Sequence, residues 1–169
     1  LAGDALTEGD LNTVVGVIAL GADTKGSRAV AIGRNALGSQ NFTTATANYN
    51  VAVGYSAGGT ISTGIQNVFI GGEAGDGTDD GLNNVAVGYA ALSANCGEEN
   101  TCLGQNAGTA ITGSYNNCLG AASGAYTVLL TSGSKNNLIG NYVHTSAVDS
   151  VNQTVLGYNV AGSANSTLT

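Results

Sequence analysis

The sequence of 169 residues contains no Pro, Met or Trp, and only 9% of its residues are charged. Disordered chains combine high charge with low hydrophobicity, so a hydrophobic fraction of 43% argues against disorder. No apolar run approaches the roughly 18 residues of a transmembrane helix, and no basic segment precedes an apolar one as in a signal peptide. We therefore expect no membrane insertion of this segment and no signal peptide. Because the chain does not begin with Met, we expect it to be a fragment of a longer protein or a processed one.

Basic residues are scarce as well, and four of them stand against eleven acidic residues, which gives a formal net charge of −7. Nucleic-acid binding requires a basic surface that neutralises phosphates, and binding to an anionic membrane surface requires the same. The sequence therefore excludes a nucleic-acid partner. The four basic residues are Lys25, Arg28, Arg34 and Lys135.

Metal-binding residue types are few, with three cysteines and one histidine. Cys96, Cys102 and Cys118 show none of the C-x-x-C spacing of structural zinc sites, and an odd number does not suit a disulfide framework. We expect three buried free thiols, with Cys102 and Cys118 on neighbouring repeats, and no metal or other cofactor.

Catalytic patterns are weak. His144 lies close in sequence to Ser146, Asp149 and Ser150, but a catalytic triad is defined by geometry, and no G-x-S-x-G motif is present. We therefore expect no enzyme and assign no catalytic residue.

One segment, 71–81, gathers acidic residues. Clustered carboxylates are the ligands that Ca²⁺ prefers, but the spacings of the EF-hand and of the calcium-binding nonapeptide are absent. We favour a solvated acidic loop and assign no metal ligand. The residues are Glu73, Asp76, Asp79 and Asp80.

A short motif recurs along the chain. It is clearest as NVAVGYSAG (50–58), NVFIGGEAG (67–75), NVAVGYAAL (84–92) and NTCLGQNAG (100–108), and five weaker copies extend the series. The glycines at its centre, the anchor glycines, follow one another at sequence spacings of 17, 21, 17, 17, 16, 16, 20 and 17. They are Gly16, Gly33, Gly54, Gly71, Gly88, Gly104, Gly120, Gly140 and Gly157. The repeat covers nearly the whole chain, so we predict a single domain over residues 1–169.

The residues before each anchor glycine are apolar at two adjacent positions. The position directly before it is always Val, Ile or Leu, and the next position back is Ala, Val, Phe, Cys or Leu. Adjacent residues of a strand face opposite sides, so this pattern indicates a parallel strand that is buried on both faces. We expect the position directly before the glycine to face a core. A thin solenoid has only one interior, and the second apolar face therefore indicates a closed oligomer.

Other positions of the repeat are also restricted. Asn stands four residues before the anchor glycine in seven copies, including Asn50, Asn67, Asn84 and Asn100, which suits a turn into a strand or a ladder of stacked amides. A small residue, usually Ala, stands three residues after the glycine, which indicates close backbone approach. Glycine itself permits a tight bend. A period of about 16–17 residues has room for two short strands and two turns but not for a helix.

These features predict an all-β fold, a repetitive parallel β-roll or β-solenoid of about nine 16–17-residue rungs, packed as a homotrimer. The motif N-V-A-V-G-x-x-A resembles the head repeat of the YadA-like trimeric autotransporter adhesins, and NVAVGYAAL (84–92) is similar to the version found in bacteriophage tail fibres and tailspikes. The resemblance covers roughly residues 12–161 and implies a left-handed β-roll in which three chains pack about a threefold axis. V-G-Y-A-A-L also fits a single hexapeptide of the β-helix acyltransferases, but the longer period that this fold requires is absent.

The resemblance implies a structural or receptor-binding segment of a trimeric phage tail fibre, located on the virion surface and mediating host attachment. The alternative is the head domain of a bacterial cell-surface adhesin. The adhesin repeat is typically shorter than the repeat of this chain, and three cysteines suit assembly in a reducing cytosol better than secretion through a narrow pore. Both points favour the fibre. The expected partner outside the trimer is a glycan or protein receptor on the host cell, and its binding residues remain unassigned.

Exposed recognition residues have two sources in the sequence. Two spacings are long because of insertions at 38–48 and 125–135, and a solenoid accommodates such residues in protruding turns. Their apolar residues, Phe42 and the run 128–130, either pack against the solenoid or contact a receptor, and we favour packing. The tyrosines present a similar choice, because their rings either stack on sugars or pack against strand edges of the solenoid, and again we favour packing. These are Tyr49, Tyr55, Tyr89, Tyr115 and Tyr158.

Overall fold

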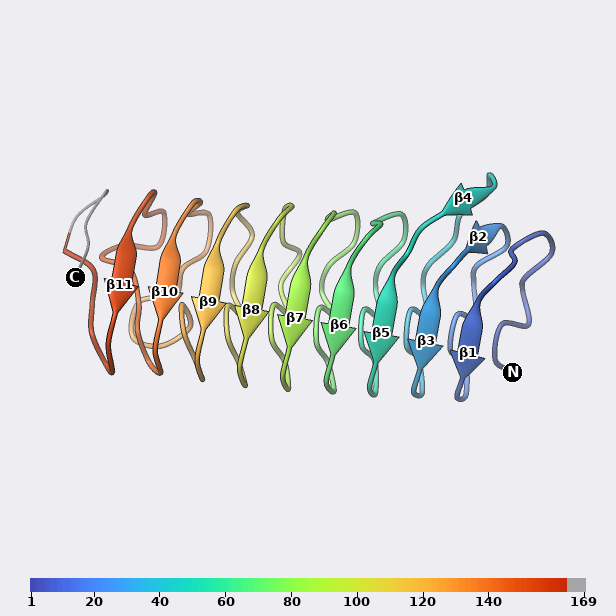
Figure 1. Cartoon of the computed structure of the whole chain (residues 1–169), viewed down its shortest axis with the longest axis horizontal. Coiled ribbons are helices and arrows are strands. Elements are labelled where there is room, and N and C mark those ends of the chain that lie inside the picture. Colours follow the sequence, from blue (N-terminus) through green and yellow to red (C-terminus); the bar gives the residue numbers. More distant parts are fainter. Residues whose placement is uncertain (164–169) are drawn as a thin grey trace.

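Residues 1–163 are described by a computed structural model, in which the chain winds into an elongated parallel β-solenoid (Figure 1). One sheet of nine strands runs the length of the rod in the order β1-β3-β5-β6-β7-β8-β9-β10-β11. The strands are β1 (Thr13–Val15), β3 (Val30–Ile32), β5 (Val51–Val53), β6 (Val68–Ile70), β7 (Val85–Val87), β8 (Thr101–Leu103), β9 (Asn117–Leu119), β10 (Asn137–Ile139) and β11 (Thr154–Leu156). At a spacing of ~4.8 Å between strands, the rod is about 40 Å long.

Every strand of this sheet consists of the three residues before an anchor glycine, and neighbouring strands pair in parallel with the repeat in register. Ala52 is opposite Phe69, for example, and Phe69 is opposite Ala86. No described residue lies in a helix. The prediction of an all-β parallel β-solenoid is confirmed, and its nine stacked strands make about eight full turns.

The expectation of two strands in each repeat is wrong, because most repeats carry one. Within residues 1–163, only β2 (Gly26–Ser27) and β4 (Thr46–Ala47), which pair with each other, add a second strand. The rest of each turn is interrupted by residues with positive φ, such as Ser56 at 55° and Gln66 at 60°. A left-handed residue cannot continue an extended strand, so the chain turns there. These positions recur two residues after and five residues before the anchor glycine.

The core is narrow, and two columns of small and apolar side chains run along its length. One is the middle residue of each strand, two before the anchor glycine, which is fully or almost fully buried from β3 to β11. The other is the small residue three after the glycine. These core residues are Ala31, Ala52, Phe69, Ala86, Cys102, Cys118, Leu138 and Val155 in the first column, and Ala19, Ala36, Ala57, Ala74, Ala91, Ala107, Ser123 and Val143 in the second.

The residue directly before the anchor glycine does not face this core, and the sequence-based assignment was wrong for the single chain. Val15 is 57% exposed, Leu119 46% and Leu156 59%. A three-residue strand places its first and last side chains on one face and its middle side chain on the other, and the middle one points inward here. The first and last residues therefore form the outer surface of the sheet.

Core volume is balanced between neighbouring turns. Phe69 is the largest side chain in the strand column, and the position four residues after its anchor glycine is Gly75. A Cβ at Gly75 would lie 2.5 Å from the Phe69 ring, and one at Gly58 would lie 2.9 Å from it. Where the strand column holds Ala86, the corresponding position holds the buried Leu92. In these two neighbouring turns a large residue at one position is thus matched by a small one at the other, as close packing requires.

The anchor glycines form a continuous spine along the rod. Their φ values lie between 128° and 149°, a region that L side chains rarely adopt. They also stack closely, so that a Cβ on Gly88 would lie 2.6 Å from the carbonyl oxygen of Gly104. Both the backbone conformation and the contact with the next turn exclude a side chain at these positions.

The asparagines four residues before the anchors form a buried ladder. In each step the backbone N–H of one asparagine donates to the side-chain Oδ1 of the previous one, as from Asn67 to Asn50 and from Asn84 to Asn67, both at 2.9 Å. The Nδ2 group donates across the turn to a backbone carbonyl, as from Asn67 to Gly81 at 2.8 Å. The ladder continues through Asn100, Asn116, Asn136 and Gln153.

Asparagine tolerates a positive φ, but the asparagines of this ladder do not adopt one. The residue directly before each of them has the positive φ. Their side chains satisfy backbone groups that are inaccessible to water, and an unpaired buried group is costly. The role of this column is therefore hydrogen bonding between turns.

Candidate functional site

Of the two predicted sets of repeat residues, the asparagines lie inside the rod and the anchor glycines are half-buried. Asn50, Asn67, Asn84 and Asn100 are fully buried, and the anchor glycines present no side chain. These residues hold the turns together and offer no group to a ligand. Any functional site must therefore lie on the outer surface of the solenoid.

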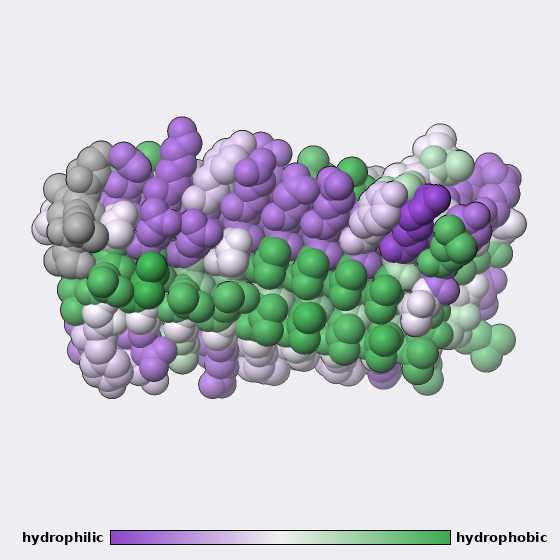
Figure 2. All heavy atoms as spheres, viewed as in Figure 1, coloured by the Kyte–Doolittle hydropathy of each residue, from purple (hydrophilic) through white to green (hydrophobic). Residues whose placement is uncertain are grey.

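One side of the nine-stranded sheet presents an extended apolar surface, formed by the residues one and three before each anchor glycine. We call this surface the outer face. Ile70 is 40% exposed and Val87 36%, and the valines three before these glycines are half-buried. Figure 2 shows the outer face as an apolar band that runs along the rod. Single chains seldom expose so extended an apolar surface, which is typical of a contact between proteins.

The outer face changes character towards the C-terminal end. Val30, Val51, Val68 and Val85 occupy its first column in β3 to β7, whereas Asn117 and Asn137 occupy that column in β9 and β10. Asn117 donates through Nδ2 to Oδ1 of Asn137 at 2.8 Å, at the surface. This pair interrupts the apolar band with hydrogen-bonding groups.

The three cysteines are free and buried. Cys102 and Cys118 are opposite each other in the β8–β9 register, as the sequence predicted. Their mutual contact and burial raise the pKa of the Cys102 thiol, and burial raises the pKa of Cys96, whose sulfur lies 3.3 Å from Thr78 Oγ1. Buried thiols of raised pKa are poor nucleophiles, so these cysteines act as small core residues.

The acidic segment 71–81 does not gather its carboxylates around one point. Ser62 donates to the Asp79 carboxylate, while Glu73 accepts from the Tyr89 hydroxyl and thereby raises the pKa of Tyr89. Burial, followed by the charge of Glu73, raises the pKa of Asp76. Over residues 1–163 no group of three or more His, Cys, Asp or Glu side chains is arranged to hold a metal ion.

The first insertion, 38–48, is tied into the core by a buried polar network. The carboxylate of Asp23 is fully buried and accepts hydrogen bonds from the backbone N–H of Gly26 and Phe42, each at 3.0 Å, and from Gln40 Nε2 at 2.6 Å. Gln40 in turn accepts from Asn50 Nδ2 at 2.8 Å. The insertion therefore joins the asparagine ladder through this network.

The same insertion repairs a gap in the ladder. Ala29 occupies the ladder position of its turn and has no amide to offer. Asn48, which belongs to the insertion, accepts the N–H of Asn50 through its Oδ1 at 2.9 Å. Phe42 is 7% exposed, so the packing role expected for this apolar residue is confirmed.

The second insertion, 125–135, has a more exposed arrangement. Ala125 and Leu129 form an antiparallel bridge that turns the chain outward after the Gly120 turn. Leu130 is fully buried beneath it, whereas Leu129 is 42% exposed and Tyr126 47% exposed. This insertion thus anchors one leucine in the core and displays its first half to solvent.

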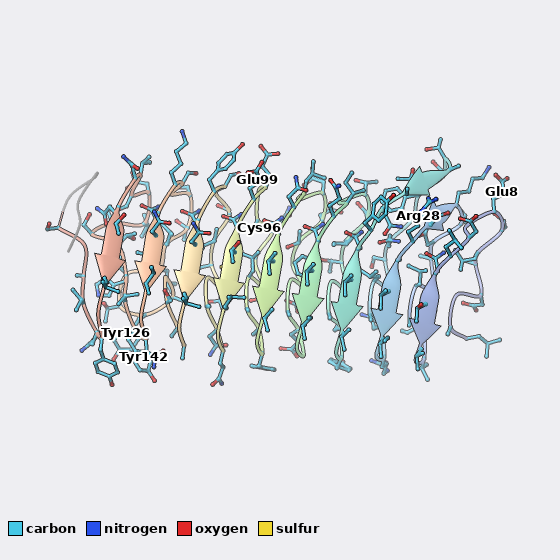
Figure 3. The ribbon with its side chains drawn as sticks, viewed as in Figure 1. Glu8, Arg28, Cys96, Glu99, Tyr126 and Tyr142 are labelled. Carbon is cyan, nitrogen blue, oxygen red and sulfur yellow. The ribbon has the colours of Figure 1, made fainter. Side chains whose placement is uncertain are left out.

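Three tyrosines from three successive turns meet beside the second insertion, and we call Tyr126, Tyr142 and Tyr158 the tyrosine cluster. The ring centroids of Tyr126 and Tyr142 are 4.9 Å apart at an interplanar angle of 57°, and those of Tyr142 and Tyr158 are 5.8 Å apart at 88°. Tyr158 is 70% exposed. Figure 3 shows Tyr126 and Tyr142 projecting together from the C-terminal end of the rod.

A hydroxyl–imidazole pair lies next to the cluster along the chain. His144 Nδ1 is 3.0 Å from the Thr145 carbonyl oxygen, and a carbonyl only accepts, so Nδ1 carries the proton. Nε2 lies 2.7 Å from the Thr127 hydroxyl, and in the Nδ1–H tautomer it accepts the hydrogen bond of that hydroxyl. The serines that the sequence placed near His144 do not join it, because Ser146 pairs with Ser150 and Gln153.

Sequence reasoning did not identify Tyr126 or Tyr142 as candidates. The available signal was spacing, because Tyr126, Tyr142 and Tyr158 follow one another at equal intervals that match the repeat period. Their offsets from the anchor glycines differ, since the insertion shifts Tyr126, and a comparison of fixed positions in the repeat therefore does not align them.

The other tyrosines are exposed as single rings, against the packing role expected for them. Tyr55 and Tyr89 are each 54% exposed. The Arg34 guanidinium lies 5.6 Å from the centre of the Tyr55 ring, and that of Arg28 lies 5.8 Å from the Tyr49 ring. Cation–π contacts of this kind attract the guanidinium to the ring face and leave the ring exposed to solvent.

Comparisons with protein families, with curated proteins and with solved structures found no match. Within residues 1–163, no helix has the length and apolar character to cross a membrane. The surfaces that the structure offers are therefore the outer face and the tyrosine cluster with its neighbouring Thr127–His144 pair.

Proposed function

We propose that this chain is a rod segment of a trimeric fibre on a virion, comparable to the shaft or tip of a bacteriophage tail fibre, that takes part in attachment to a host cell. The observation that carries the proposal is the outer face, an apolar band that runs along the sheet and is interrupted by Asn117 and Asn137. A stiff solenoid with such a face is suited to lateral packing against identical rods.

Three chains that bury their outer faces about a common axis remove this apolar surface from water, and each Å² so buried contributes roughly 25 cal/mol. The parallel in-register strands suit such packing, because successive turns present the same side chains at a constant spacing. The resemblance of the repeat to YadA-like and tail-fibre repeats supports the same assembly.

The free thiols favour the virion setting over the surface of a bacterium. All three cysteines are reduced and buried, which suits a protein that folds in a reducing cytosol before particle assembly. An adhesin head exported through a pore is the alternative. The identity of the genes beside the one that encodes this chain distinguishes the two, because tail genes accompany a fibre.

The assembly is tested by native mass spectrometry of the purified chain and of the Ile70→Asp/Val87→Asp double variant. We expect a trimer for the natural sequence and a monomer for the variant, because two carboxylates on the outer face resist burial. Gln105→Asp adds one carboxylate at an exposed position outside the outer face and should remain trimeric. A stable folded monomer of the natural sequence at micromolar concentration would contradict the proposal.

Attachment is tested with the fluorescently labelled trimer on a panel of bacterial strains. We expect saturable binding to some strains and competition by the unlabelled trimer. Absence of binding to the strain that the parent particle infects would place host recognition outside this segment.

A further inference from the structure

The tyrosine cluster differs from the other aromatic residues in how it is built. Three rings from three turns converge, although each could have been placed alone on its own turn as Tyr55 and Tyr89 are. Their mutual contacts hold the rings in fixed relative positions, while Tyr126 and Tyr158 keep about half or more of their surface in solvent. Convergent exposed aromatic rings on a rigid scaffold form a preorganised recognition surface.

We propose that the tyrosine cluster, together with Thr127 and His144, binds a neutral saccharide. This inference rests on the proposed attachment function and names the ligand class and the place where it binds. A pyranose ring has an apolar face of C–H groups, and the negative π-face of tyrosine attracts their partial positive charge. The hydroxyl groups around the sugar ring then require polar partners at the edge of the aromatic surface.

The Thr127–His144 pair supplies such partners. The Thr127 hydroxyl donates a hydrogen bond to His144 Nε2 in the Nδ1–H tautomer. The Thr127 oxygen therefore keeps lone pairs that accept a hydrogen bond from a sugar hydroxyl. The tyrosine hydroxyl groups add partners that both donate and accept. The two kinds of group are neighbours in the sequence, because Thr127 follows Tyr126 directly and only Val143 separates Tyr142 from His144.

Charge decides for a neutral rather than an acidic saccharide. Between Gly120 and Ala147 the chain carries one formal charge, that of Lys135, and the other three basic residues all lie in the first quarter of the sequence. Two of those, Arg28 and Arg34, lie against other tyrosines. An anionic sugar would find Lys135 as the only cation of this segment, nine residues along the chain from Tyr126, and would meet a chain of net charge −7.

The inference is tested by saturation-transfer NMR of the purified protein with chitohexaose, maltohexaose, cellohexaose and mannohexaose as neutral probes, and with a sialylated hexasaccharide as the acidic probe. We expect transfer to ring protons of at least one neutral probe and none to the acidic one. Titration of that neutral probe against Tyr126→Ala and Tyr158→Ala should show binding at least tenfold weaker, and Thr127→Ala should weaken it severalfold.

Tyr55→Ala and Tyr89→Ala are the matched controls, because they remove equally exposed rings outside the cluster and should leave saccharide binding unchanged. Thermal unfolding of all variants checks that each retains the fold. Failure of every neutral probe to bind, preference for the acidic probe, or equal losses in the control and cluster variants would overturn the inference.

Cell binding separates this inference from the proposed function. If Tyr126→Ala and Tyr158→Ala trimers bind cells as the natural sequence does, the saccharide site is not the attachment site and the inference fails while the attachment function stands. If neutral saccharides bind but no cells are bound, the site exists and the proposed attachment function fails.

Discussion

The two insertions lengthen the repeat to almost the same extent, with anchor-glycine spacings of 21 and 20. The first nevertheless packs against the core, whereas the second is partly exposed to solvent. The first, 38–48, is drawn inward by the buried Asp23–Gln40–Asn50 network and by Phe42. The second, 125–135, buries Leu130 and turns Tyr126 and Leu129 outward. Insertion length therefore does not indicate whether an added segment supports the rod or presents a surface. The difference lies in which partners its polar groups find.

The largest effect should come from Asp23→Ala, which removes the acceptor of three buried donors. Each unsatisfied buried donor costs ~1–3 kcal/mol, so we expect the free energy of unfolding to fall by about 4 kcal/mol or more. Chemical denaturation measures this change. Asp4→Ala, at the exposed N-terminal end, should change the stability by less than about 0.5 kcal/mol. Equal effects of the two substitutions would show that the first insertion is not held by this network.

An intermediate effect is expected within the second insertion, from a pair of adjacent leucines. Leu130→Ala opens a cavity in the core and should cost about 3 kcal/mol, whereas the exposed Leu129→Ala should cost under about 1 kcal/mol. Differential thermal unfolding of the two variants compares them directly. Similar melting temperatures would contradict the division of this insertion into a buried and a displayed part.

The smallest effect should come from Thr127→Ala, which removes the surface hydrogen bond to His144. Because both partners regain hydrogen bonds to water, we expect a change in stability within about 0.5 kcal/mol, alongside the loss of saccharide affinity described above. Thermal unfolding and saccharide titration on the same sample measure both. A large loss of stability would mean that the second insertion supports the rod as the first does.

The sequence was sufficient to predict the parallel solenoid and its register, because one glycine and three apolar residues recur with nearly constant spacing. It was not sufficient for the inward and outward assignment of Ile70 or Val87, since both faces of the strand are apolar and only the three-dimensional turn decides which is enclosed. The second strand expected in each repeat is absent because residues such as Ser56 and Gln66 adopt a left-handed backbone conformation. Ser and Gln do not indicate this conformation in a sequence, so it could not be predicted.

The sequence also did not predict which residues replace a side chain that one copy of the repeat lacks. Asn48 replaces the amide absent at Ala29 from a different place in the sequence, and the Asp23–Gln40 pair joins residues of two turns. The tyrosine cluster has the same origin, since Tyr126 reaches Tyr142 only because the insertion shifts it along the turn. Such contacts depend on how the turns stack, which a comparison of aligned repeats does not contain.

The direction of the asparagine ladder has a mechanical consequence. Its hydrogen bonds, like those of the sheet, run from turn to turn along the rod, so a pulling force on the two ends loads successive turns in series. An isolated rod under tension would open one turn at a time from an end, at low force, because each step breaks the bonds of a single turn. Compression and bending instead press the turns together on the loaded side. A bundle of such rods is accordingly better suited to hold a tip at a distance than to bear a load as a tether.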